Sequence, residues 1–224
     1  AAALRAVELV IEKGRRVAAG LLEAAEADID YGGGAFRITG TDRAVSLFEV
    51  AEKAAASGEP LDSKARAEVP QSFPNGCHVC EIEIDPETGI VTIPSYVAVD
   101  DCGVALDPVL VDGQIQGGVA QGIGQALYED AVYDPRSGQL LAGSFMDYTM
   151  PRADTVPDVV GVLHPVPCRT NPLGVKGTGE AGTTGALAAV MNAITDALPG
   201  TALDMPATPE KIWRALRQLE PGEN

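Results

Sequence analysis

The fold is decided by a glycine-rich run near the C-terminal end, Thr170-Asn171-Pro172-Leu173-Gly174-Val175-Lys176-Gly177-Thr178-Gly179-Glu180-Ala181-Gly182. Four glycines leave the backbone N–H groups of this run unobstructed. A helical pattern follows from about Thr183, and the N-terminus of a helix attracts anions through its N–H groups and its dipole. Lys176 adds a positive charge, which is unusual in so acidic a chain. The run therefore predicts a ligand site at the start of a helix.

The same loop fits the dinucleotide fingerprint Gly177-x-Gly179-x-x-Gly182, with Asp204 about twenty residues further on. That fingerprint leaves a strand directly inside a tight βαβ unit. Here three prolines precede the loop and no such unit surrounds it. A nucleotide-binding domain stays as an alternative, and it predicts a parallel sheet with an adenine nucleotide at the helix that follows.

Glu180 lies within this loop, and Lys176 is the one basic residue near it in sequence. Burial would raise the pKa of its carboxyl, whereas the helix dipole and Lys176 would lower it, so the residues leave the direction open. Glu180 is a candidate general base. The alternative is an acid in the first helical turn that interacts with the dipole.

A second feature lies in the expected helix 114–129, where Gln114, Gly118, Gln121 and Gln125 share one face and apolar residues share the other. An amide both donates and accepts hydrogen bonds, and glycines allow close approach, so this face suits a heterocycle such as a pterin. Alternatively, the glycines serve tight packing and the amides are solvated or bond to neighbouring backbone.

Hydrophobic periodicity and capping signals predict the remaining elements. We expect helices over 4–26, 46–56, 114–129, 184–198 and from Thr208, and strands over 35–39, 79–84, 90–99, 138–148 and 159–163. Residues 57–75 have a loop composition. The fold class that follows is α+β, a mixed or antiparallel sheet with helices packed on one side, in a single domain over 1–224.

The charge, hydropathy and cysteine content of the chain disfavour several classes of function. Thirty-two acidic residues against sixteen basic ones give a net charge of −16, which disfavours nucleic acid as a partner. No apolar stretch is long enough for a membrane span and no signal-peptide pattern is present, so we expect a cytoplasmic protein. We expect reduced thiols and no metal ligands, because the Cys77 and Cys80 pair would point to opposite faces of a strand.

Four motifs carry a resemblance to a known family, and they stand in its order and spacing: Asp101-Cys102-Gly103, Gly113 to Gly122, Gly143 to Tyr148 and Asn171 to Gly182. Together they resemble the large chain of the molybdenum hydroxylases, the family of xanthine dehydrogenase, aldehyde oxidase and aerobic carbon monoxide dehydrogenase. The amino-acid sequence of residues 99–103 and 171–174 is most similar to that of the carbon monoxide dehydrogenase branch, although this chain has Asp107 where that branch has Asn.

The resemblance implies an oxidoreductase, with this chain as its C-terminal, second molybdopterin-binding domain and a fragment of a longer large subunit. Glu180 would be the base for hydroxylating an aldehyde, a purine-like heterocycle or carbon monoxide. Gln114, Gln121, Lys176, Gly177, Thr178 and Gly179 would bind molybdopterin, which could be the cytosine dinucleotide form. Implied partners are the rest of the large subunit and iron–sulfur and FAD subunits. The isolated fragment would lack cofactor and activity; a non-catalytic scaffold is the other alternative.

Overall fold

The computed structural model describes residues 1–219, and the chain divides into two compact units, one ending at Pro70 and the other starting at Gln71. Each unit has its own apolar core, one around Phe36 and one around Tyr96. This differs from the single domain expected over 1–224. Between Ser57 and Pro74 there is no helix or strand, and the division falls within that segment.

The first unit packs two helices on a small antiparallel sheet of order β1-β2-β3. Its elements are α1 (Ala2–Leu22), a 3₁₀ turn (Glu26–Asp28), β1 (Ile29–Gly32), β2 (Ala35–Ile38), β3 (Ala44–Ser46) and α2 (Leu47–Ala56). Helix α1 continues through Gly14, where a Cβ would lie 2.3 Å from Cζ of the buried Phe36 ring. A capping box begins α2, in which Ser46 and Glu49 exchange hydrogen bonds.

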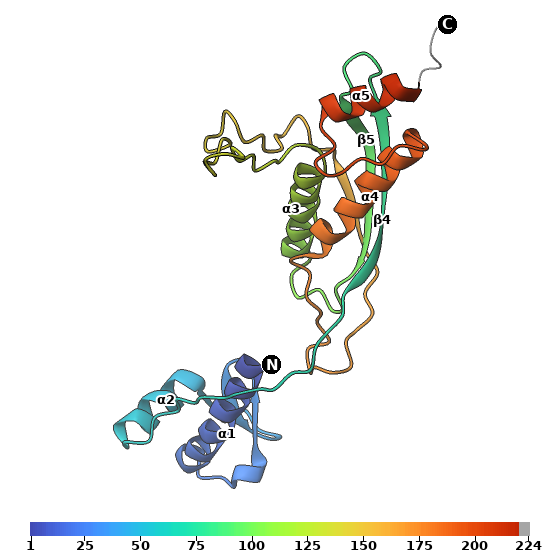
Figure 1. Ribbon diagram of the computed structural model, residues 1–224. Coiled ribbons are helices and arrows are strands. Elements are labelled where there is room, and N and C mark those ends of the chain that lie inside the picture. Colours follow the sequence, from blue (N-terminus) through green and yellow to red (C-terminus); the bar gives the residue numbers. More distant parts are fainter. Residues whose placement is uncertain (220–224) are drawn as a thin grey trace, which may run out of the picture. The chain divides into compact units, whose positions relative to one another are not determined.

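The second unit is built on a three-stranded mixed sheet. Strands β4 (Asn75–Ile84) and β5 (Val91–Asp101) form the expected hairpin, and β6 (Val159–Leu163) pairs in parallel with β5. Helices α3 (Pro108–Leu127) and α4 (Ala181–Ala197) pack on each other and on one face of the sheet, with α5 (Pro209–Leu219) near the hairpin turn (Figure 1). The α+β class with a mixed sheet is confirmed.

Two helices start earlier than their sequence patterns indicated. Helix α3 begins at Pro108 because the Asp107 side chain accepts hydrogen bonds from the backbone N–H groups of Val109 and Leu110. Helix α4 begins at Ala181, which makes Glu180 its N-cap. Glu180 therefore lies at the start of its helix, whereas Gln114 lies in the second turn of α3 rather than at its start.

The predicted strand 138–148 is wrong. Its apolar alternation lacks a partner strand, and one isolated bridge joins Tyr133 to Leu140. Further on, the chain turns between Ser144 and Asp147, whose side chains are hydrogen-bonded to each other. This segment runs out from the unit as a long loop (Figure 1), with Phe145 and Met146 about nine-tenths exposed.

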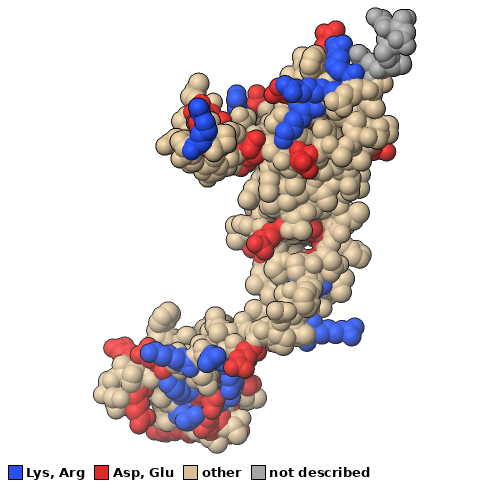
Figure 2. Space-filling model, viewed as in Figure 1, with Lys and Arg blue, Asp and Glu red and all other residues tan. Residues whose placement is uncertain are grey.

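Charged side chains are unevenly distributed over the second unit. On the face drawn in Figure 2 they gather around α5, while few lie over α3 and the sheet. Among residues 1–219, no helix is long and apolar enough to cross a membrane.

Candidate functional site

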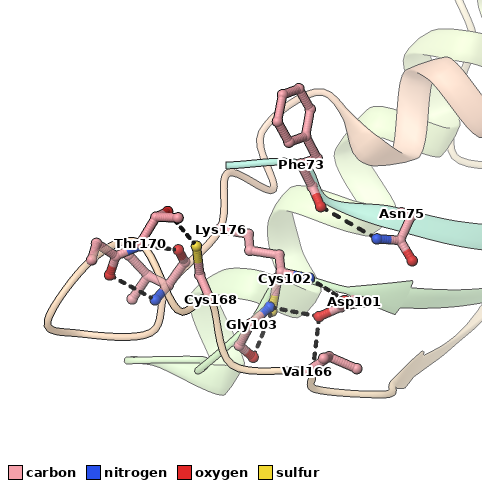
Figure 3. A network of polar contacts seen from close by, with 11 residues as sticks. Phe73, Asn75, Asp101, Cys102, Gly103, Val166, Cys168, Thr170 and Lys176 are labelled. Atoms are coloured by element: carbon pink, nitrogen blue, oxygen red, sulfur yellow. Dashed lines mark hydrogen bonds and ion pairs between the residues drawn. The ribbon is translucent and has the colours of Figure 1, made fainter. Parts of the chain in front are cut away.

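The glycine loop is fastened to the end of β5 by Asp101. One carboxylate oxygen, Oδ1, accepts hydrogen bonds from the backbone N–H groups of Gly103 and Val166, each at 2.9 Å. The other, Oδ2, forms a buried ion pair with the Lys176 ammonium. Figure 3 shows Lys176, Gly103 and Val166 converging on this carboxylate. Hydrogen bonding from Lys176 is the main cause that lowers the pKa of Asp101 to about 2, so the pair is ionised at neutral pH.

Backbone contacts hold the loop to the same strand end. The N–H group of Lys176 donates to the Cys102 carbonyl at 2.8 Å, and that of Val104 donates to the Gly174 carbonyl at 2.9 Å. Gly103 adopts a φ of 66°, and a Cβ on it would lie 2.3 Å from the Gly174 oxygen. A side chain at position 103 would therefore force the loop away from the strand.

Lys176 helps to fix the loop to β5. Its ammonium pairs with Asp101, and its backbone N–H group donates to the Cys102 carbonyl. Its expected part in cofactor binding stays a prediction.

The next three residues have the free donors that Lys176 lacks. Within residues 1–219, the N–H groups of Gly177, Thr178 and Gly179 donate to no acceptor. The hydroxyl of Thr178 is buried and likewise has no partner among the described residues. A buried hydroxyl without a partner costs free energy, so the loop is shaped for a group that supplies hydrogen-bond acceptors.

Glu180 follows these donors at the N-cap of α4. Its side chain makes no capping hydrogen bond, and it is exposed. It lines a cavity of about 290 Å³ together with the start of β4, the end of β5 and the first turns of α4. The carboxylate is thus positioned by a helix end and is open to a ligand.

The glutamines of α3 border the same helix end. The Gln114 side-chain oxygen lies 3.7 Å from the place of a Cβ on Gly179, and that of Gln121 lies 3.4 Å from the Thr183 hydroxyl. Both glutamines are exposed, whereas Gly118 and Gly122 are buried against α4. The glycines of this face therefore serve packing, as one interpretation held, while the two amides are exposed, with the Gln121 oxygen accepting a hydrogen bond from Thr183.

Sequence reasoning missed a buried polar group on the floor of the cavity. The His78 imidazole is 2.9 Å from the Tyr96 hydroxyl through Nδ1 and 3.2 Å from an Asp100 carboxylate oxygen through Nε2. The side chains of His78 and Asp100 are 4% and 5% exposed. The available signal was periodicity, since His78 shares its strand face with Cys80, Ile82 and Ile84, which pack toward the core.

The four cysteines are free thiols, and Cys77 and Cys80 do point to opposite faces of β4. Burial raises the pKa of the Cys80 thiol to about 11. Within residues 1–219, no three His, Cys, Asp or Glu side chains gather into a possible metal site.

Comparison with known proteins agrees with this geometry. A family model described as a molybdopterin cofactor-binding domain matches residues 1–157. Over 96% of its length the chain is 39% identical to the nicotine 6-hydroxylase large subunit of Paenarthrobacter nicotinovorans. It is 36% identical, over 99% of its length, to the gamma subunit of the 6-hydroxypseudooxynicotine dehydrogenase complex from that organism. The crystal structure of a Cu,Mo carbon monoxide dehydrogenase superposes on 94% of the chain with a TM-score of 0.83 at 28% identity.

The chain spans 28–29% of the length of these three proteins. The family match covers the first compact unit and extends into the second as far as residue 157, and the structural match covers 94% of the chain. The resemblance seen in the four sequence motifs is thereby confirmed. The chain belongs to the molybdopterin-binding domains of the molybdenum hydroxylase large subunits.

Proposed function

We propose that this chain forms one side of a molybdenum hydroxylase active site, in which Glu180 is the general base. The N–H groups of Gly177, Thr178 and Gly179 and the Thr178 hydroxyl would hold the pterin cofactor, and Gln114 and Gln121 would contact it from α3. The observation that carries the proposal is the unpartnered, buried Thr178 hydroxyl, which stands beside three free N–H groups and two residues before the N-cap glutamate.

The donor set fits a molybdopterin chemically. A pterin carries ring nitrogens and a carbonyl oxygen, and its side chain ends in a phosphate, so it offers acceptors to backbone N–H groups at a helix start. The open cradle at Gly177, where a Cβ would meet nothing within 4 Å, leaves room for close approach. We include the cytosine dinucleotide form in the proposal, with its nucleotide released by acid hydrolysis as the test.

When bound, the cofactor supplies the oxygen-transfer and redox chemistry. Glu180 takes the proton that must leave as oxygen is transferred to the substrate carbon. Its carboxylate is exposed at the helix N-terminus and makes no capping hydrogen bond, so it is open to accept that proton.

The substrates we propose are an aldehyde, a purine-like or pyridine-type heterocycle, or carbon monoxide. Two relatives are named for nicotine and for 6-hydroxypseudooxynicotine, so nitrogen heterocycles are the first substrates to test. We also propose that the chain works with the rest of a large subunit and with iron–sulfur and FAD partners, in the cytoplasm.

The test uses the assembled large subunit with its partner subunits. We expect Glu180→Gln to retain molybdenum while turnover falls by about three orders of magnitude or more. Glu87→Gln, an exposed acid in the β4–β5 turn, is the matched control and should turn over normally. Absence of molybdenum from the wild type, or normal turnover by Glu180→Gln, would overturn the proposal.

A further inference from the structure

The buried His78 side chain touches the helix that carries Glu180. A Cβ placed on Gly185 would lie 2.4 Å from Nδ1 of His78 and 2.6 Å from its Cε1. Only a residue without a side chain lets α4 approach the ring so closely. Gly185 is five residues after Glu180, so the ring lies beneath the second turn of the helix.

A similar glycine makes room for Asp100 on the other side of the pair. A Cβ on Gly76 would lie 2.5 Å from an Asp100 carboxylate oxygen. Asp100 is on β5, and Gly76 and His78 are on the neighbouring strand β4. Two glycines from different elements thus frame one buried polar group.

The partners of His78 fix both the orientation and the tautomer of the ring. The Asp100 carboxylate only accepts hydrogen bonds, so Nε2 carries a ring hydrogen and donates to it. The Tyr96 hydroxyl, which can donate, is the partner of Nδ1. All three side chains come from β4 and β5, so the sheet determines where the ring stands.

We infer that His78 and Asp100 are positioning residues for Glu180. The imidazole packs with a fixed orientation between the sheet and the second turn of α4, and it thereby sets the position of the Glu180 carboxylate. His78, Asp100 and Glu180 all line the same cavity. This inference rests on the proposed function, because it assigns the pair a role through the base. A misplacement of about 1 Å at a reacting group can lower the rate by a factor of about 100.

Matched variants in the assembled enzyme separate positioning from charge. Asp100→Asn keeps an oxygen acceptor for Nε2, whereas Asp100→Leu removes it. We expect Asp100→Leu and Gly185→Ala to lower kcat about 10- to 100-fold while KM and molybdenum content stay near wild type, and Asp100→Asn to stay within about threefold of wild type. Tyr96→Phe, which loses a single hydroxyl, is the milder variant should Asp100→Leu fold poorly, and it should lower kcat in the same direction.

A second readout needs neither cofactor nor turnover. The chain has two histidines, His78 and His164, so ¹⁵N-histidine labelling gives two side-chain spin systems, which His164→Gln assigns. We expect His78 to carry a hydrogen on Nε2 that is bonded to residue 100 in the wild type and in Asp100→Asn, and to lose this hydrogen bond in Asp100→Leu. A solvent-exchanging ring with the hydrogen on Nδ1 would overturn the inference.

The outcomes distinguish this inference from the proposed function. If Glu180→Gln turns over normally, the base assignment fails and the positioning role fails with it. If Glu180→Gln is inactive but Asp100→Leu and Gly185→Ala keep wild-type kcat, the proposed function stands and the positioning role fails alone. Equal losses in Asp100→Asn and Asp100→Leu would show that the charge of Asp100 matters, rather than the orientation of the ring.

Discussion

Asp101 carries the most strongly lowered carboxyl pKa for which the structure gives a cause, and that cause is Lys176. A carboxyl with a folded-state pKa of about 2, below its ordinary 3.8, contributes stability that is complete above about pH 4. That contribution is lost as the pH falls from about 4 to about 2, and it is on the order of 2 kcal/mol. The ion pair therefore makes the second unit sensitive to acid.

Replacing Lys176 by Met should lower the free energy of unfolding by about 3 kcal/mol at pH 7, because Asp101 is left buried without its counter-ion. The loss should shrink as the pH falls from about 4 to about 2 and vanish below that, because Asp101 is protonated in both proteins only below its wild-type pKa of about 2. Urea titrations at several pH values measure this. Arg214→Met breaks an exposed pair with Glu210 and should cost under about 1 kcal/mol. Equal losses in both variants would contradict the burial argument.

Thr178→Val should separate ligand binding from stability. The hydroxyl is buried without a partner, so removing it should leave the cofactor-free chain as stable as the wild type, or more stable by about 1 kcal/mol. The same change should lower the molybdenum content of the assembled enzyme. Thermal unfolding and metal analysis test the two halves. A chain destabilised by more than about 1 kcal/mol would show that the hydroxyl has a structural partner instead.

The glycine motif alone predicted most of the residues that the structure gathers at the start of α4. Gln114, Gln121 and Glu180 come together there with Gly177–Gly179, and their roles toward a cofactor remain proposals. The ion pair of Lys176 was not predicted, because sequence shows a charge but not its partner, here Asp101, 75 residues away. His78 and Asp100 were missed for the same reason, since a strand pattern indicates which face is buried and not what meets it.

Helices α3 and α4 owe their close approach to small residues. A Cβ on Gly122 would lie 2.6 Å from the Ala186 Cβ, whereas one on Gly117 of the same helix would meet nothing within 4 Å. A Gly-to-Ala change should therefore lower the free energy of unfolding at position 122 and raise it at position 117.

We expect Gly122→Ala to destabilise the chain by about 1–3 kcal/mol, because overpacking outweighs the gain in helix propensity. Gly117→Ala should stabilise it by up to about 1 kcal/mol. Urea denaturation of both variants gives the comparison. A stabilised Gly122→Ala variant would show that the two helices can separate at little cost.

Sequence patterns predicted elements well where one face is buried. The hairpin, β6, α2 and α5 match their apolar periodicity and caps. The predicted strand 138–148 is wrong because alternation alone provides no partner for its backbone groups. The start of α3 was missed because the exposed Val109 and Leu110 show no amphipathic pattern, and the Asp107 cap determines it.

The whole chain contains two cores rather than one, which has a consequence for unfolding. Lys64 and Arg66 are exposed in the segment between the helix α2 and the strand β4. We expect limited trypsin digestion to cut there first and to leave two fragments that each keep their circular dichroism and unfold in separate transitions. Rapid loss of either fragment, or one shared transition in the uncut chain, would contradict two independent cores.

The hydrogen bonds between the glycine loop and β5 also affect the free energy of ligand binding. Because Asp101, Cys102 and Gly103 hold the loop through hydrogen bonds made within the fold, the entropy of ordering residues 174–176 is lost when the sheet forms. A molecule arriving later meets donors whose directions are already set, so its binding energy is not consumed in shaping them. Asp101 thereby contributes to the order of the loop through Lys176 and Gly103.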